Sequence, residues 1–267
     1  MSFDSILIVG CGNMGGAMLA GWLAGGMAPA RVTVVDPNLA EAPAGVTLLR
    51  DLPERAFNAV LLGVKPQLLG DVAPRLAALV GPQTVLLSIL AGAELDSLGR
   101  FFPDAGAIVR IMPNLAAAIG KSPVALFAQG LDDAGRASVT ALMQPLGTPE
   151  WLAGEAQFDL VTALAGSGPA FVYRFIDALA AGASRLGLPA EQAQRLAVAT
   201  VEGAAALAAA SPHSPGALAD RVASPGGTTR AGLDVLDRDL ALATLVEATL
   251  KAAADRSAEM ARDARSR

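Results

Sequence analysis

The chain has 267 residues, of which 53% are hydrophobic and 17% charged; this suits one large or two small packed domains and excludes a disordered protein. Its 20 lysines and arginines against 25 aspartates and glutamates give a net charge of -5 without any basic run, so we expect no nucleic-acid partner. Cys11 and His213 are the only cysteine and histidine, which excludes an intrachain disulfide and a Cys- or His-rich metal site; we expect no metal.

The first part of the chain alternates short apolar runs with helical segments. Strands are predicted at 6–9, 31–35, 59–64, 84–88 and 107–109, and helices at 14–23 and from Pro66 to about residue 80. Residues 5–30 carry no charge, but their glycines and the lack of a basic start argue against a signal peptide or membrane helix. We expect a cytoplasmic protein without membrane contact. The strand–helix alternation predicts a doubly wound parallel sheet of the Rossmann-like type.

After about residue 158 every segment is helical in pattern. Helices are predicted at 169–186, 190–210, 215–222, 228–236 and 240–264, separated by Gly, Pro and Ser. The chain is therefore divided into a dinucleotide-binding domain, residues 1–158, and an all-α dimerisation and substrate domain, residues 159–267. Helices between 169 and 210 are too apolar to face water on a monomer, which predicts a homodimer through this half.

A glycine-rich loop follows the first predicted strand and opens a helix. Gly10 permits the turn, Gly12 lets the backbone approach a pyrophosphate, and Gly15 allows close packing of helix and strand. A tight turn without ligand is the plainer reading of the same pattern. The context favours dinucleotide binding, and we expect the cofactor to contact Gly10, Cys11, Gly12, Asn13, Met14 and Gly15.

Asp36 ends the second predicted strand, where an acidic side chain accepts hydrogen bonds from the adenosine ribose. That position favours NAD and repels the 2′-phosphate of NADP, although Arg31 or Arg50 could offset the repulsion. On the residues alone, Asp36 before Pro37 is equally well a turn that stops a strand.

Three further polar breaks follow apolar runs. Val64, Lys65 and Pro66 come where a strand leaves the carboxyl edge of the sheet, the edge at which ligands of such sheets gather, although a lysine there is commonly solvated. Residues 110–114 and 166–170 form the other two breaks, and helix contact alone explains the small residues of the latter.

A second glycine loop, residues 224–228, lies between two predicted helices. Its two glycines allow a tight reversal, and the threonines that follow stand at a helix N-terminus, where free N–H groups can hold a carboxylate. Two such loops indicate one for a cofactor and one for a substrate.

These motifs together resemble the pyrroline-5-carboxylate reductase family. The resemblance rests on the residues at 10–15, 64–66, 112–114 and 166–170 and on the specific signature at 220–229. These motifs occur in the family's order, and together they span most of the chain. It implies reduction of a cyclic imino acid, 1-pyrroline-5-carboxylate, to L-proline with NADPH or NADH, the last step of proline biosynthesis. It also implies an intertwined homodimer, which in this family can assemble further into a ring of dimers.

The resemblance also implies the site residues. The cofactor would lie against the first loop, Asp36, Arg50, Val64, Lys65, Pro66, Ala91, Gly92 and Asn114; the substrate would be held by Ser224, Gly227, Thr228 and Thr229. Thr229 would be the catalytic residue, hydrogen-bonding the ring nitrogen. Two departures matter: Ser214 rather than histidine precedes Pro215, and Asp36 stands where NADP-preferring members often carry a small or neutral residue.

Two alternatives remain at this point. A β-hydroxyacid-type dehydrogenase would place a catalytic lysine on the helix after residue 168, but residues 169–177 contain none. A non-catalytic NAD(P)-binding protein would be expected to have lost the second loop, whereas residues 224–229 are intact.

Overall fold

The computed structural model describes residues 3–265, with side chains through residue 262. Backbone contacts divide the chain into two compact units, which are described separately. Unit 1 runs through Gly166 and resumes at Ala253, and unit 2 is Ser167–Ala252. The compact units thus divide at residue 166, whereas the predicted domains 1–158 and 159–267 divide at 158. The outermost residues of those domains lie outside the described part, and the predicted roles of the two domains remain predictions.

Unit 1 is built on one eight-stranded sheet with the order β3-β2-β1-β4-β5-β6-β7-β8. Neighbouring strands from β3 through β6 pair in parallel, whereas β7 runs antiparallel to β6. The order reverses beside β1, which makes the β1–β4 junction the topological switch point of the sheet. The strands are β1 (Ile6–Val9), β2 (Val32–Val35), β3 (Thr47–Leu49), β4 (Ala59–Leu62), β5 (Val85–Ser88), β6 (Ala107–Met112), β7 (Ser122–Gln129) and β8 (Gly147–Trp151).

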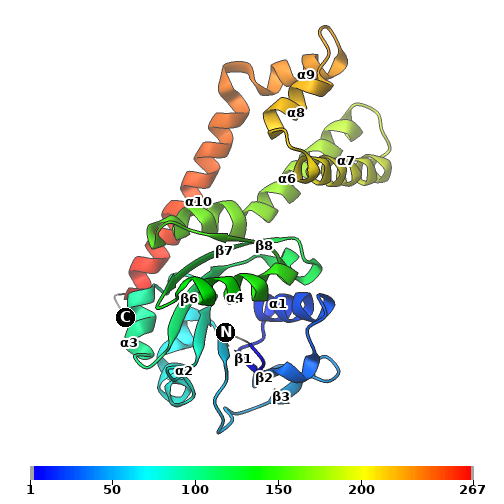
Figure 1. The fold of residues 1–267 in the computed structure, drawn as a ribbon. Coiled ribbons are helices and arrows are strands. Elements are labelled where there is room, and N and C mark those ends of the chain that lie inside the picture. The colour runs from blue at the N-terminus through cyan, green and yellow to red at the C-terminus, as the bar shows by residue number, and fades with distance from the viewer. Residues whose placement is uncertain (1–2, 266–267) are drawn as a thin grey trace. The chain divides into compact units, whose positions relative to one another are not determined.

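Helices cover both faces of this sheet (Figure 1). Alternate strand residues point to opposite faces, so Ile8 packs with Met18 and Trp22 on one side while Leu7 packs with Leu76 and Leu98 on the other. Burial on both faces explains why the central strands are continuous apolar runs. The helices are α1 (Asn13–Ala24) and α4 (Asp133–Met143) on the first face, and α2 (Leu69–Leu76) and α3 (Leu95–Phe101) on the second. The Rossmann-like prediction is confirmed.

Unit 1 closes with α5 (Phe158–Val161), a π-helical turn (Thr162–Gly166) and the last residues of α10 (Ala241–Arg265). Ser257 Oγ on α10 donates to Asp159 Oδ1 at 2.8 Å. Among the described residues, no helix combines the length and the apolar character that crossing a bilayer requires.

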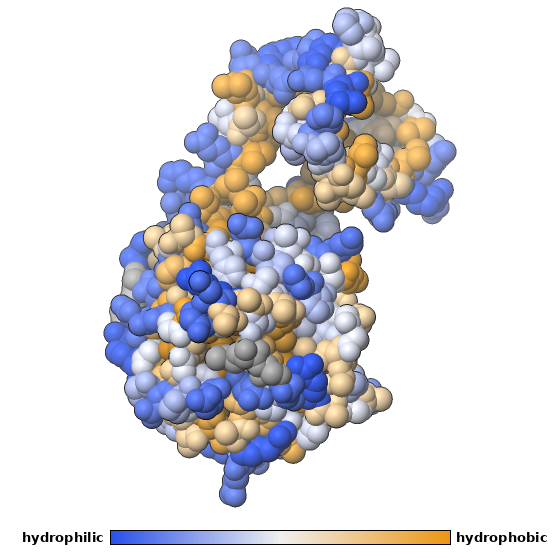
Figure 2. Space-filling model, viewed as in Figure 1, coloured by the Kyte–Doolittle hydropathy of each residue, from blue (hydrophilic) through white to orange (hydrophobic). Residues whose placement is uncertain are grey.

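Unit 2 consists of helices only, as predicted: α6 (Gly168–Arg185), α7 (Ala190–Ala210), α8 (Pro215–Val222), α9 (Thr228–Leu236) and the first part of α10. Its buried apolar residues are all alanines, whereas Tyr173, Phe175 and Leu207 are exposed and Leu186 is 91% exposed. Figure 2 shows such apolar side chains on the surface of these helices. A layer with so little interior cannot hold its fold by burial within one copy of the chain.

Candidate active site

Two glycines interlock where β1 and β4 end. Gly10 has a φ of +85°, and a Cβ on it would lie 2.8 Å from the backbone nitrogen of Val64. A Cβ on Gly63 would lie 2.3 Å from the carbonyl oxygen of Gly10. Only glycine fits either position. The close approach brings the first loop against Gly63 and Val64, directly before Lys65 and Pro66.

The remaining glycines of the first loop have different roles. A Cβ on Gly15 would meet the Gly10 carbonyl oxygen at 2.8 Å, so Gly15 permits close packing of the helix on its strand. A Cβ on Gly12 would meet nothing within 4 Å. Gly12 is also the N-cap of α1, and no side chain caps the first N–H groups of this helix. That geometry fits a pyrophosphate.

Asp36 directly follows β2 and holds the first loop in place. Its Oδ2 accepts the Cys11 N–H at 2.8 Å, and its Oδ1 accepts the N–H groups of Asn38 and Leu39 at 2.8 and 3.1 Å. Asp36 therefore forms the turn that ends β2, and its carboxylate also lies beside the glycine loop. The two interpretations offered by the sequence, turn residue and ribose ligand, are compatible in this geometry.

The two arginines proposed to offset Asp36 lie in different places. Arg50 follows β3 and its Nη1 donates to the carbonyl oxygens of Asp36 and Leu39 at 2.9 and 2.6 Å, so it closes the loop after β2 at the predicted edge. Arg31 precedes β2 and binds the Phe3 carbonyl and Asp4. It lies at the opposite end of β2, roughly 17 Å from Asp36 at about 3.3 Å per strand residue. The expectation that Arg31 could help is wrong.

Cys11 is buried in the first loop. Its burial, and secondarily the nearby Asp36 carboxylate, raise the pKa of the thiol above its ordinary value. The residue is therefore a neutral thiol at neutral pH and takes part in the loop through its backbone N–H.

Lys65, Ala91 and Gly92 follow the next two strands at the same edge. Lys65 is exposed and caps a short 3₁₀ turn (Pro66–Leu68), with Pro66 at its first position as predicted. Gly92 lies after β5 with a φ of +75°, and its Cβ would be 3.2 Å from Ala261 Cα on α10. The end of α10 thus packs directly on this loop.

Asn114 follows β6 and is buried. Its Oδ1 accepts the Ala116 N–H and its Nδ2 donates to the Ala165 carbonyl oxygen, both at 2.9 Å. The acceptor it reaches lies in the π-helical turn, where the regular helical ladder is interrupted. Asn114 therefore joins two backbone segments, a contact that the sequence did not suggest.

An ion pair that the sequence analysis missed lies at the same edge. The sequence predicts a polar break at residues 110–114, but strand β6 continues through Arg110, and Arg110 Nη1 lies 2.7 Å from Glu155 Oε1. Nothing local signals a partner 45 residues away.

The second loop, in unit 2, forms the predicted helix start. Gly226 has a φ of +72°, Gly227 is the N-cap of α9, and Thr228 and Thr229 are exposed in its first turn. The Gly227 N–H donates to the Ser224 carbonyl oxygen at 2.9 Å, so the free donors come from the threonines that follow. A Cβ on Gly227 would lie 2.6 Å from Ser224 Oγ and 3.1 Å from the Ser224 carbonyl oxygen, so a larger residue there would displace the Ser224 side chain and crowd the loop.

One ion pair links the helices on either side of this loop. Arg230 Nη2 on α9 donates to Asp220 Oδ1 on α8 at 2.9 Å. His213 lies in the preceding connection, exposed, with its Nε2 2.8 Å from Arg221 Nη1. The sole histidine thus contacts an arginine.

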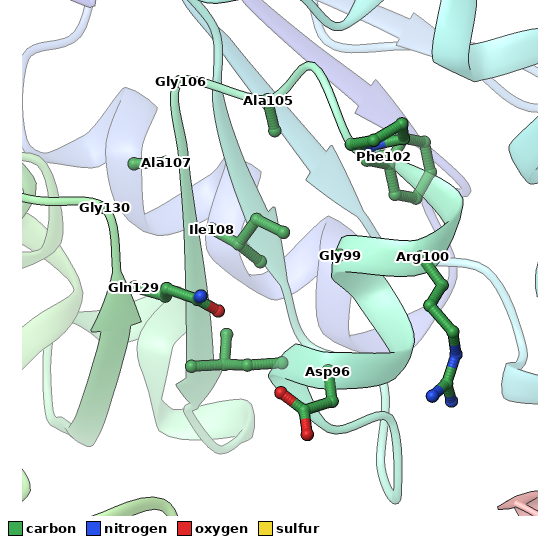
Figure 3. A pocket seen from close by; sticks show the side chains of 12 residues that line it. Asp96, Gly99, Arg100, Phe102, Ala105, Gly106, Ala107, Ile108, Gln129 and Gly130 are labelled. Atoms are coloured by element: carbon green, nitrogen blue, oxygen red, sulfur yellow. The ribbon is translucent and has the colours of Figure 1, made fainter.

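A separate hollow of about 610 Å³ lies beside α3 and the start of β6, lined by residues such as Asp96, Phe102 and Gln129 (Figure 3). Arg100 extends away from the strands in this view and bonds Ser97 Oγ at 3.0 Å. None of the predicted site residues lines this hollow. No cluster of three or more His, Cys, Asp or Glu side chains suited to a metal occurs in the part of the chain that the structure describes.

The structure therefore gathers the predicted cofactor residues at the carboxyl edge of one sheet and the predicted substrate residues in one loop of unit 2. A mostly parallel sheet with a glycine loop at its switch point defines the Rossmann-like class of nucleotide-binding folds.

Comparisons with known proteins narrow this class to one family. A family model described as pyrroline-5-carboxylate reductase dimerisation matches residues 155–260. The pyrroline-5-carboxylate reductase of Pseudomonas aeruginosa is 35% identical over 98% of each chain. The pyrroline-5-carboxylate reductase structure from Coxiella burnetii matches with a TM-score of 0.89 and 30% identity, covering 97% of this chain and 98% of that one. The chain belongs to the pyrroline-5-carboxylate reductase family.

A more distant structure shares the fold. The Plasmodium falciparum pyrroline carboxylate reductase, solved with NADP bound, matches with a TM-score of 0.83 and 23% identity over 98% of this chain and 99% of that one.

Proposed function

We propose that this protein reduces 1-pyrroline-5-carboxylate to L-proline with NAD(P)H, the last step of proline biosynthesis, in the cytoplasm. The observation that carries the proposal is the loop at 224–229, which presents a helix N-terminus and two threonine hydroxyls together. A substrate whose carboxylate is attached to the carbon next to a ring nitrogen would use both features, the N–H groups for the carboxylate and a hydroxyl for the nitrogen. Membership of the family supports the same substrate.

The cofactor fits the carboxyl edge of unit 1. The open space at Gly12 and the free first turn of α1 suit a pyrophosphate, Asp36 and Arg50 would flank the adenosine ribose, and the segments at 64–66 and 91–92 would hold the other half. When bound, the dihydronicotinamide supplies the hydride that reduces the imine carbon.

The chain's own residues position the substrate. The backbone N–H groups of Thr228 and Thr229 would hold the carboxylate at the start of α9, and the Thr229 hydroxyl would hydrogen-bond the ring nitrogen. The imine nitrogen is protonated from water, so no acidic side chain is required for the reaction. Gly227 serves by shaping the loop, since its N–H is used within it.

One assay tests this function directly. Reduction of pyrroline-5-carboxylate at neutral pH, and oxidation of proline or thioproline at high pH, are measured with each cofactor. We expect turnover in both directions. Turnover of β-hydroxyacids instead, or cofactor binding without any imine reduction, would overturn the proposal.

Cofactor preference depends on Asp36. We propose that the protein uses both NADPH and NADH as hydride donors with only a modest preference. Other members of the family commonly prefer NADPH, whereas Asp36 favours NADH. Asp36→Asn removes the charge and keeps an acceptor for Asn38 and Leu39, so the NADPH-to-NADH ratio of kcat/KM should rise about tenfold, the effect of about 1.4 kcal/mol.

Steady-state kinetics with both cofactors check this prediction. Asp36→Ser should shift the ratio in the same direction but lower both efficiencies, because the loop loses more of its hydrogen bonds. The exposed Asp51, paired with Arg75 at 3.6 Å, provides the control Asp51→Asn. An unchanged ratio in Asp36→Asn would show that Asp36 does not face the ribose.

Assembly follows from unit 2. Its exposed apolar side chains and the dimerisation model that matches residues 155–260 support a homodimer, with a ring of dimers as the further possibility that the family offers. Light scattering at micromolar concentration should give at least the dimer mass, and its value distinguishes a dimer from a ring. A fully active monomer would contradict the prediction.

A further inference from the structure

Arg110 carries a buried positive charge at the edge of the sheet where ligands gather, and it is paired with the half-buried Glu155. The Arg110 side chain is 8% exposed and that of Glu155 is 27% exposed. The Arg110 guanidinium also stacks on Phe158, with Cζ 4.2 Å from the ring centre. The strand register places Arg110 at the carboxyl edge of the sheet, because Arg110 is paired with Ser88 at the end of β5.

Glu155 binds a second partner with the same oxygen. Its Oε1 accepts the backbone N–H of Leu95, the first residue of α3, at 2.8 Å. Glu94, the N-cap of α3, makes no side-chain cap, so Glu155 caps that helix from 60 residues away. The connection between β5 and α3, which contains Ala91 and Gly92, is thereby anchored at its far end.

The anchored connection belongs to one half of the cleft. In a doubly wound sheet each half binds one mononucleotide, and the two halves meet at the switch point beside β1. Asp36 lies on the β2 side and would face adenosine. The ends of β5 and β6 lie beyond β4, on the nicotinamide side.

A buried ion pair seldom adds stability over an apolar pair of the same size, but it does impose one distance and one direction on the segments it joins. We propose that Arg110 and Glu155 are positioning residues that set the nicotinamide half of the cofactor cleft by fixing the loop at 91–92 against β6. This inference rests on the proposed function, in that it takes the bound cofactor to be a nicotinamide dinucleotide.

Binding of fragments separates this role from general stability. Arg110→Met, Glu155→Gln and the double variant are titrated with NADPH, by its fluorescence, and with 2′-phospho-ADP-ribose, which lacks the nicotinamide, by calorimetry. We expect NADPH to bind about tenfold more weakly to Arg110→Met, while the fragment binds within about twofold of the parent affinity. Arg110→Lys, which keeps the charge, should recover part of the loss.

The double variant removes both charges and so avoids a buried unpaired one. It should keep the parent's melting temperature more nearly than Arg110→Met does, while still losing NADPH affinity selectively. Arg75→Met removes an exposed arginine from the same unit, 3.6 Å from Asp51, and should change neither titration.

The outcomes are distinct. Equal losses for NADPH and the fragment, or no loss of either in the double variant, would overturn the positioning role. If the parent protein binds neither NADPH nor NADH, the proposed function fails, and this inference fails with it.

Discussion

Replacing Thr229 by valine is expected to lower kcat and kcat/KM together, by about 10- to 100-fold. Valine keeps the shape of threonine and removes only the hydroxyl, so the change isolates one hydrogen bond. The protonated ring nitrogen has no free lone pair and gains one as the hydride adds, so a hydrogen bond donated by the Thr229 hydroxyl should strengthen in the transition state. That is why kcat falls and not only KM rises. Steady-state kinetics over a full range of pyrroline-5-carboxylate concentrations measure both constants.

Thr249 offers a matched control in the same unit. It lies on α10, and its Oγ1 donates to the Leu245 carbonyl oxygen at 2.8 Å, so Thr249→Val makes the same chemical change away from the loop. We expect parent kinetics for that variant. Parent kcat in Thr229→Val as well would remove Thr229 from the mechanism and leave its backbone N–H as its only contribution.

The second large effect is expected at Gly12. Gly12→Ala should weaken cofactor binding about 100-fold, equivalent to about 2.7 kcal/mol, while the melting temperature stays near that of the parent. The added methyl group meets no protein atom within 4 Å, but it occupies the space into which the pyrophosphate must come. Fluorescence titration and thermal unfolding measure the two quantities separately.

Two other glycines make the comparison sharp. At Gly16 an added Cβ would meet only the Cys11 carbonyl oxygen, at 4.0 Å, so Gly16→Ala should leave binding intact. At Gly10 the Cβ would strike the backbone at 2.8 Å in a positive-φ position, so Gly10→Ala should lower both stability and binding. Parent affinity in Gly12→Ala would mean that the pyrophosphate lies elsewhere.

The strands that the sequence predicts are those buried on both faces. Strands β1, β2, β4 and β5 are apolar runs that end at Gly, Asp or a polar residue, and this pattern predicts them. β3 and β8 are partly exposed, and β7 and β8 contain Pro123 and Pro149, residues that disfavour a strand assignment. The antiparallel direction of β7 depends on pairing across the sheet and has no local signal.

The site divides in the same way. Glycine loops carry their geometry in a few adjacent residues, so the residues at 10–15 and 224–229 could be proposed directly. The pairing of Arg110 with Glu155, and of Asn114 with the Ala165 carbonyl oxygen, joins segments 45 and 51 residues apart. Such contacts depend on how the strands are ordered, and Arg110 in isolation is indistinguishable from a solvated residue after a strand.

The return of α10 to unit 1 has a consequence for the order in which the protein matures during synthesis. Chains fold from the N-terminus as they are made. In the loop at 10–15, Gly10 meets Gly63 and Val64 and Cys11 bonds Asp36, all of them fewer than sixty residues further along the chain. Gly92, by contrast, packs on Ala261, and Asp159 accepts a hydrogen bond from Ser257, so both contacts form only after α10 has been made. The backbone that would hold the pyrophosphate can therefore assemble early on the nascent chain, whereas the wall of the opposite half is complete only after α10 has been translated.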